Sequence, residues 1–166
     1  MPNHVDQKVI IRGDKFLVHH LHEQVRQGNF CQTVIPMPLE YNRDQSWYNW
    51  RLENWGTKWG VYEATEIDCN VPAENVFFRR DMEGDGVLSF RCNSAWAPPV
   101  KVWDALVALG LSVEAAYLDE SYNYWGYYKD GSYEDEEGER GPIWEHVERM
   151  LDATFWTEFE DEEDAA

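Results

Sequence analysis

The order of strand-like and helix-like segments constrains the fold of this chain more than any other feature of its sequence. A short β-rich run at 8–12 ends in a Gly-Asp turn, and residues 15–27 follow with apolar side chains near helical spacing. Further strands are expected at 30–35, 61–69, 76–82, 87–93, 111–118 and 121–128, and further helices at 46–53, 98–109 and 142–159. This order predicts an α+β protein with a mostly antiparallel sheet and helices packed on one face.

The length and composition fit one domain with a short appendage. A chain of 166 residues with 15% aromatic side chains can bury a core and is unlike a disordered protein. We expect a single domain over 1–157 with a Trp-rich insertion at about 40–60, followed by an acidic tail at 158–166. No apolar run is long enough for a membrane span, and no secretory signal is visible. Cys31, Cys69 and Cys92 are expected as reduced thiols of a cytoplasmic protein.

Acidic residues are concentrated toward the end of the chain. Residues 1–113 hold 14 acidic and 11 basic side chains, whereas residues 114–166 hold 18 and 3. The last third therefore carries most of the net charge of −18. One dense block, expected in a loop, consists of Glu134, Asp135, Glu136, Glu137 and Glu139. This balance argues against direct binding to nucleic acid or anionic lipid, because each phosphate contact needs a cation.

No constellation of residues indicates catalysis or a cofactor. His19 and His22 share a helix face, but nothing nearby completes a metal-ligand set, and ordinary histidines are expected there. The chain has no phosphate-binding Gly-rich loop, no nucleophile elbow and no marked nucleophile–base pair. The sequence thus favours a protein that is not an enzyme and holds no metal and no cofactor.

The Trp-rich segment at 47–59 has two interpretations. It holds four tryptophans in thirteen residues. In the first interpretation these rings form an aromatic ligand pocket that includes Asn54, Trp55, Lys58 and Trp59, with Lys58 and Asn54 as polar anchors. In the second, which we favour, the segment is a Trp-clasped loop that closes one edge of the sheet.

Four short segments in this order carry a resemblance to a known family. They are MPNHV at 1–5, IPMP at 35–38, NWGTKW at 54–59 and SAWAPP at 94–99. Over about residues 1–130 the chain resembles the phage- and plasmid-encoded YubB ferredoxin-like family. The resemblance implies a ferredoxin-like sandwich and carriage on a mobile genetic element. The family often has Thr where Ser94 stands and Asp where Gly60 stands, and it has no agreed activity from which site residues could be transferred.

Two functions are compatible with these observations. The first is a non-enzymatic phage or plasmid accessory protein that binds and inhibits a basic host protein that handles nucleic acid or provides defence, as an anti-CRISPR or anti-restriction protein does. Its carboxylates would act as a DNA mimic, since duplex DNA presents one charge per ~1.7 Å of its axis. Tyr and Trp are enriched in interface hot spots, so the expected partner-binding residues are Glu134, Asp135, Glu136, Glu137, Glu139, Tyr124, Trp125, Tyr127 and Tyr128. The alternative is a nucleotide-binding or nucleotide-sequestering protein that uses the Trp-rich loop; the oligomeric state is left open.

Overall fold

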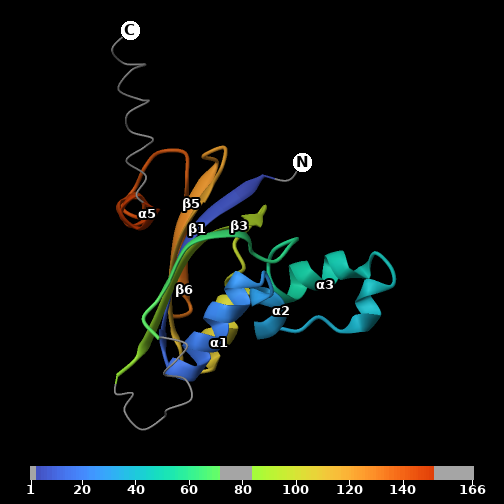
Figure 1. Cartoon of the computed structure of the whole chain (residues 1–166). Coiled ribbons are helices and arrows are strands. Elements are labelled where there is room, and N and C mark those ends of the chain that lie inside the picture. The colour runs from blue at the N-terminus through green and yellow to red at the C-terminus, as the bar shows by residue number, and fades with distance from the viewer. Residues whose placement is uncertain (1–2, 72–83, 152–166) are drawn as a thin grey trace.

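An antiparallel six-stranded sheet with the order β2-β3-β1-β4-β5-β6 organises the molecule (Figure 1). The computed structural model describes residues 3–71 and 84–151. The strands are β1 (His4–Gly13), β2 (Tyr62–Cys69), β3 (Gly86–Ala95), β4 (Ser112–Asp119), β5 (Tyr124–Lys129) and β6 (Ser132–Glu137). The helices are α1 (Lys15–Arg26), α2 (Phe30–Val34), α3 (Ser46–Asn54), α4 (Val100–Ala108) and α5 (Trp144–Leu151), with a 3-10 turn η1 (Leu39–Asn42). The expected α+β class and antiparallel sheet are confirmed.

Several expectations fall on residues outside this description. The strand expected at 76–82 and the acidic tail at 158–166 both lie there, as does the end of the helix expected at 142–159.

The main core lies between the sheet and the helices α1 and α4. Strand β1 places alternate residues in this core, among them Val5, Val9 and Ile11, because successive side chains of a strand point to opposite faces. Helix α1 begins where the Asp14 carboxylate accepts hydrogen bonds from the backbone N–H groups of residues 16 and 17, and it buries Val18, Leu21 and Val25.

Helices cover both faces of the sheet, which corrects the expectation that they pack on one face. In β4, Val113, Ala115 and Tyr117 belong to the main core, whereas Ala116 and Leu118 belong to a second cluster on the opposite face. That second cluster also contains Trp144, Val147 and Leu151 of α5. The physical reason is that β4 is apolar on both sides, as strands covered on two faces are. Figure 1 shows α5 and α1 on opposite sides of the sheet.

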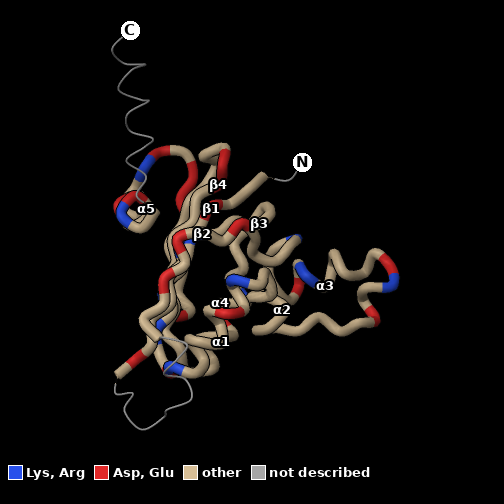
Figure 2. The backbone as a smooth tube through the Cα atoms, viewed as in Figure 1, with Lys and Arg blue, Asp and Glu red and all other residues tan. Residues whose placement is uncertain are grey.

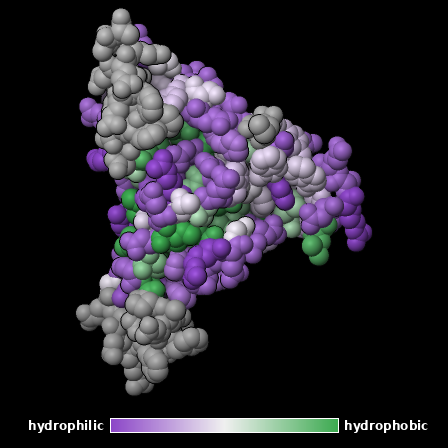
Figure 3. Space-filling model, turned by 45° about the horizontal axis from the view of Figure 1, so that its top comes forward, coloured by the Kyte–Doolittle hydropathy of each residue, from purple (hydrophilic) through white to green (hydrophobic). Residues whose placement is uncertain are grey.

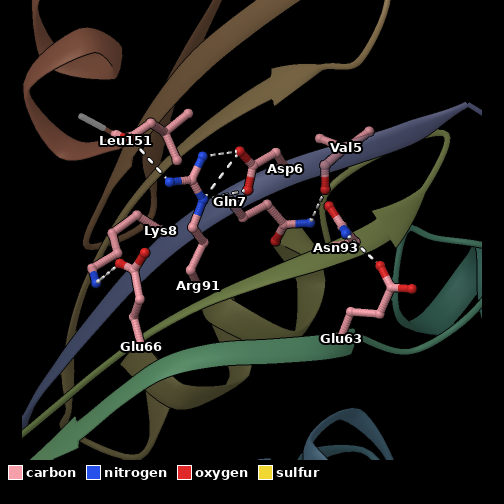
Figure 4. A network of polar contacts seen from close by, with 9 residues as sticks. All are labelled: Val5, Asp6, Gln7, Lys8, Glu63, Glu66, Arg91, Asn93 and Leu151. Carbon is pink, nitrogen blue, oxygen red and sulfur yellow. Dashed lines mark hydrogen bonds and ion pairs between the residues drawn. The ribbon is translucent and has the colours of Figure 1, made fainter. Parts of the chain in front are cut away.

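Arg91 of β3 connects the centre of the sheet to α5. Its Nε donates to both oxygens of Asp6 on β1, at 3.0 and 3.2 Å, and its Nη1 donates to the backbone carbonyl of Leu151 at 3.1 Å (Figure 4). Lys8 and Glu66 form an ion pair beside it at 3.4 Å. The polar side chains in this part of the sheet therefore satisfy one another and hold α5 in place.

Two local predictions were wrong in type. The segment expected as a strand at 30–35 is helix α2, because its aromatic and β-branched residues follow tertiary packing: Phe30 and Cys31 are both buried, next to each other in sequence. The acidic block, expected in a loop, lies mostly in strand β6. A two-residue turn of Asp130 and Gly131, both with positive φ, joins β5 to β6, and this is the backbone geometry that favours hairpins.

Charged residues are unevenly placed over this scaffold. Figure 2 shows acidic positions along the β6 side of the sheet and in the segment that leads to α5. On the face seen in Figure 3, hydrophobic residues gather in the middle of the view, while the arm that carries α3 is mostly hydrophilic. The two edges of the molecule therefore present different chemistry to solvent.

Candidate functional site

The acidic block is divided between the two faces of the sheet. Because β6 alternates, Glu134 and Glu136 lie on the face that carries α5, whereas Asp135 and Glu137 lie on the face that carries α4. Glu139 is exposed in the segment between β6 and α5. The structure therefore does not bring the predicted carboxylates together on one surface.

Glu136 has a structural role on the α5 face. Its carboxylate accepts hydrogen bonds from Trp125 Nε1 at 2.9 Å and from the backbone N–H groups of Gly141 and Ile143, both at 3.1 Å. Desolvation raises the pKa of Glu136, but these hydrogen bonds stabilise the ionised form by more, so its pKa lies below the usual range. Glu136 thus fixes the chain that enters α5.

The aromatic residues predicted to bind a partner are largely engaged inside the protein. Trp125 and Tyr128 are buried in the core, and the Tyr128 hydroxyl donates to Asp104 at 2.8 Å. Tyr127 donates to Glu114 at 2.7 Å, and burial, followed by this bond, raises the pKa of Tyr127 to about 12. A partner could not reach Trp125 or Tyr128 without opening the core.

A groove of about 490 Å³ lies between β6 and the junction of β3 with α4. Its walls come from three parts of the chain: the junction, helix α4, and the outer strands β5 and β6. The lining side chains that matter for recognition are Trp96, Lys101, Asp104, Tyr124, Tyr133, Asp135 and Glu137. Tyr124, Asp135 and Glu137 were predicted partner-binding residues, whereas the other four were not.

The groove is acidic. It contains three carboxylates and one ammonium group, and the Nζ of that lysine, Lys101, donates to the carbonyl of Glu53 at 2.5 Å. Asp135 accepts a hydrogen bond from the hydroxyl of Tyr117, whose pKa is raised above its usual value by burial and by this bond. Glu137 is exposed and makes no hydrogen bond or ion pair with any other described residue. The groove therefore offers negative charge to a ligand from outside.

Exposed aromatic rings border the groove. Trp96 is 42% exposed and Tyr133 is 51% exposed. Trp96 has a φ of 70°, a backbone conformation that bulky residues rarely adopt. Hydrogen bonds hold it there: its N–H donates to the carbonyl of Asn3 at 2.9 Å, and the Tyr124 hydroxyl donates to its carbonyl at 2.5 Å. Trp96 is therefore presented to solvent by a fixed backbone.

The Trp-rich loop docks on the same junction. Thr57 is buried and its hydroxyl donates to the carbonyl of Ala95 at 2.9 Å, while Lys58 Nζ lies 4.6 Å from the ring centre of Trp96. Two sequence segments that resemble the YubB family, at 54–59 and 94–99, thus contact each other. This arrangement agrees with the structural interpretation of the loop.

The four residues of the predicted ligand pocket do not surround one cavity. Asn54 donates to the carbonyl of Trp50 at 2.8 Å, and Trp55 is buried with its Nε1 donating to the carbonyl of Ile35 at 2.9 Å. Trp55 and Trp59 line a different cavity, together with Arg51.

The described residues show no metal-ligand set and no membrane helix. Over 3–71 and 84–151, no group of three or more His, Cys, Asp or Glu side chains could hold a metal ion. In the same part of the chain, no helix is long and apolar enough to cross a bilayer.

Comparison of the chain with protein-family models, curated proteins and solved structures gave no match. The resemblance to the YubB ferredoxin-like family therefore stays a prediction.

Proposed function

We propose that this protein is a binding protein, not an enzyme, and that it recognises a basic segment of a partner protein in the groove beside β6. The observation that carries the proposal is the pairing of exposed aromatic rings with carboxylates in one groove. Lys and especially Arg side chains stack on Trp and Tyr faces and pair with carboxylates. Trp96 and Tyr133 supply the rings, and Asp135 and Glu137 supply the charge.

The edge position of β6 supports the same proposal. β6 is the last strand of the described sheet, so its outer backbone groups have no neighbouring strand. Carboxylates on an edge strand repel a second copy of the same edge, whereas they attract an extended basic segment that could add as a further strand. The partner is therefore expected to present Arg or Lys in an extended conformation.

This function is compatible with the counter-defence role expected from the sequence. A host protein that handles nucleic acid carries basic segments for phosphate contacts, and occupation of such a segment would inhibit it. The proposed DNA mimicry is narrower than the sequence suggested, because it depends on the α4 face of β6 and not on the whole acidic block.

We further propose that the first four strands form a ferredoxin-like unit. Their chain order is β1-α1-β2-β3-α4-β4, apart from the insertion that holds α2, η1 and α3, and their order in the sheet is β4-β1-β3-β2. A βαββαβ order of this kind is the ferredoxin-like pattern. In this view β5, β6 and α5 are an addition at the β4 edge, and the proposed groove lies where the addition meets the unit.

The test is the binding of short extended peptides to the purified protein. A fluorescent peptide with alternating Arg residues should bind saturably at low salt and more weakly at high salt, while an acidic peptide of equal length should not bind. Trp96→Ala should weaken binding about tenfold, as removal of an aromatic hot spot does. Glu137→Gln should weaken it several-fold.

Glu145→Gln is the matched control, because Glu145 is exposed on α5, away from the groove, and the substitution removes the same charge. If Glu145→Gln weakened binding as much as Glu137→Gln, the interaction would depend on net charge alone and the groove would have no special role. Absence of saturable binding by the basic peptide at low salt would also overturn the proposal.

A further inference from the structure

A cationic cavity lies at the opposite edge of the sheet, beside β2. Arg51 of α3 lies against the rings of Trp47 and Trp55, with its guanidinium carbon 5.0 Å from each ring centre. These tryptophans are one helical turn before and one turn after Arg51. Stacking engages the faces of a guanidinium group, so its N–H groups, which lie in its plane, are left for an acceptor.

Arg51 has no acidic partner in the described part of the chain. No carboxylate of residues 3–71 or 84–151 lies within 4.0 Å of its guanidinium, and its Nε is buried without a hydrogen-bond acceptor there. An ionised group removed from water without a partner is costly, so such groups are usually paired. Arg51 therefore lacks the anion that its surroundings favour.

The cavity beside Arg51 has the size of a small-molecule site. Its volume is about 480 Å³, and small-molecule sites commonly measure ~300–1,000 Å³. Its lining includes Arg51, Trp55, Trp59, Asn29 and Tyr62. None of its lining residues is acidic, in a chain with 32 acidic side chains.

The ring of Trp59 adds a second feature for recognition. It is partly exposed at the wall of the cavity, and Lys58 Nζ lies 4.9 Å from its ring centre. Like Arg51, Lys58 makes no ion pair within the described residues. A planar ring could stack on Trp59, while an attached anionic group paired with Arg51.

We infer that this cavity binds a small ligand that carries a phosphate or carboxylate group attached to a planar ring, with Arg51 as the anion-binding residue and Trp59 as the stacking residue. The phosphate and the carboxylate share one chemistry, since the guanidinium fork can donate two parallel hydrogen bonds to either. This site is independent of the groove beside β6.

The probes are adenosine monophosphate, adenosine, inorganic phosphate and an aromatic carboxylate, each titrated into the intact protein. We expect adenosine monophosphate or the aromatic carboxylate, or both, to shift the side-chain Nε–Hε resonance of Arg51 saturably in heteronuclear NMR, and adenosine to leave it unmoved. Isothermal titration calorimetry should give the matching affinities. Response to only one of the two anions would identify which source of the anionic group the cavity takes.

Arg51→Lys keeps the charge but loses the planar fork, and it should weaken binding at least about tenfold. Arg43→Gln is the matched control, because Arg43 is exposed in the same arm and does not line the cavity. Trp59→Leu should weaken the ring-bearing probe and leave Arg51 in place. Two results would overturn the inference: no saturable shift of Arg51 with any anionic probe, or equal affinity for inorganic phosphate and the two ring-bearing probes.

Discussion

Replacement of Gly126 by alanine tests how the wall of the acidic groove is built. Gly126 of β5 pairs with Tyr117 of β4 on one side and with Asp135 of β6 on the other. The Tyr117 side chain crosses over Gly126 to donate its hydroxyl to Asp135. A Cβ atom at position 126 would lie 2.3 Å from both Cζ and Oη of Tyr117. Non-bonded carbon atoms normally lie ~3.5–4.0 Å apart, so the ring would have to move.

The expected cost follows from the surroundings of this ring. Tyr117 is 1% exposed and packs against Trp103, with 6.2 Å between the ring centres, so it cannot move inward. Overpacking of a core costs about 1–3 kcal/mol. Loss of the hydrogen bond to Asp135 costs about 1 kcal/mol, because Asp135 is exposed and water replaces part of that bond. We expect Gly126→Ala to lower the free energy of unfolding by about 2–4 kcal/mol.

The assay is urea denaturation followed by circular dichroism, and the control is a double-mutant cycle with Tyr117→Ala. Without the tyrosine ring, the added methyl group meets no obstacle, and alanine in a strand is about 0.5–1 kcal/mol better than glycine. The cost of Gly126→Ala should therefore vanish in the Tyr117→Ala background. An equal cost in both backgrounds would refute the reasoning, since the strain would then lie elsewhere than in the ring.

Two further predictions concern titratable groups. Because the fold lowers the pKa of Glu136, its stabilising effect is present above the ordinary glutamate pKa and is lost as the pH falls through the folded value; thermal denaturation should show Glu136→Gln less stable than wild type at neutral pH, with the difference vanishing in acid, and Glu137→Gln should show no such pattern. Burial raises the pKa of Cys31 to about 12 and raises that of Cys92 well above its usual value, so a thiol reagent at mildly alkaline pH should modify the partly exposed Cys69 quickly and the other two only after urea is added; fast reaction of all three in the native protein would contradict this.

Local patterns in the sequence are sufficient for much of the fold. The helix expected at 46–53 is α3 (Ser46–Asn54), and the strand expected at 87–93 is the centre of β3, because caps, turns and periodicity act within a few residues. The missed hairpin also had a local signal: Asp130-Gly131 between two strand-like segments is a strong indicator of a two-residue turn. The acidic block could therefore have been assigned to a strand from the sequence.

The candidate sites depend on long-range contacts that no local pattern contains. Trp96 is exposed because its N–H bonds to the carbonyl of Asn3 and because Lys58 lies against its ring. The stacking of Arg51 on a neighbouring indole was foreseeable from its spacing in the helix, but the absence of a carboxylate near it was not. The sequence thus indicated which residue types matter, whereas the sheet determined which of them meet.

The position of the two proposed sites at opposite edges of one sheet makes them separable by a single substitution. The groove uses Asp135 and Glu137 of β6, and its wall depends on the Tyr117 ring, whereas the cavity uses Arg51 beside β2. Gly126→Ala should therefore change the affinity for the basic peptide while leaving the Arg51 resonance and its response to adenosine monophosphate unchanged. Equal losses at both sites would show that the substitution loosens the sheet as a whole, which is incompatible with a local displacement of Tyr117.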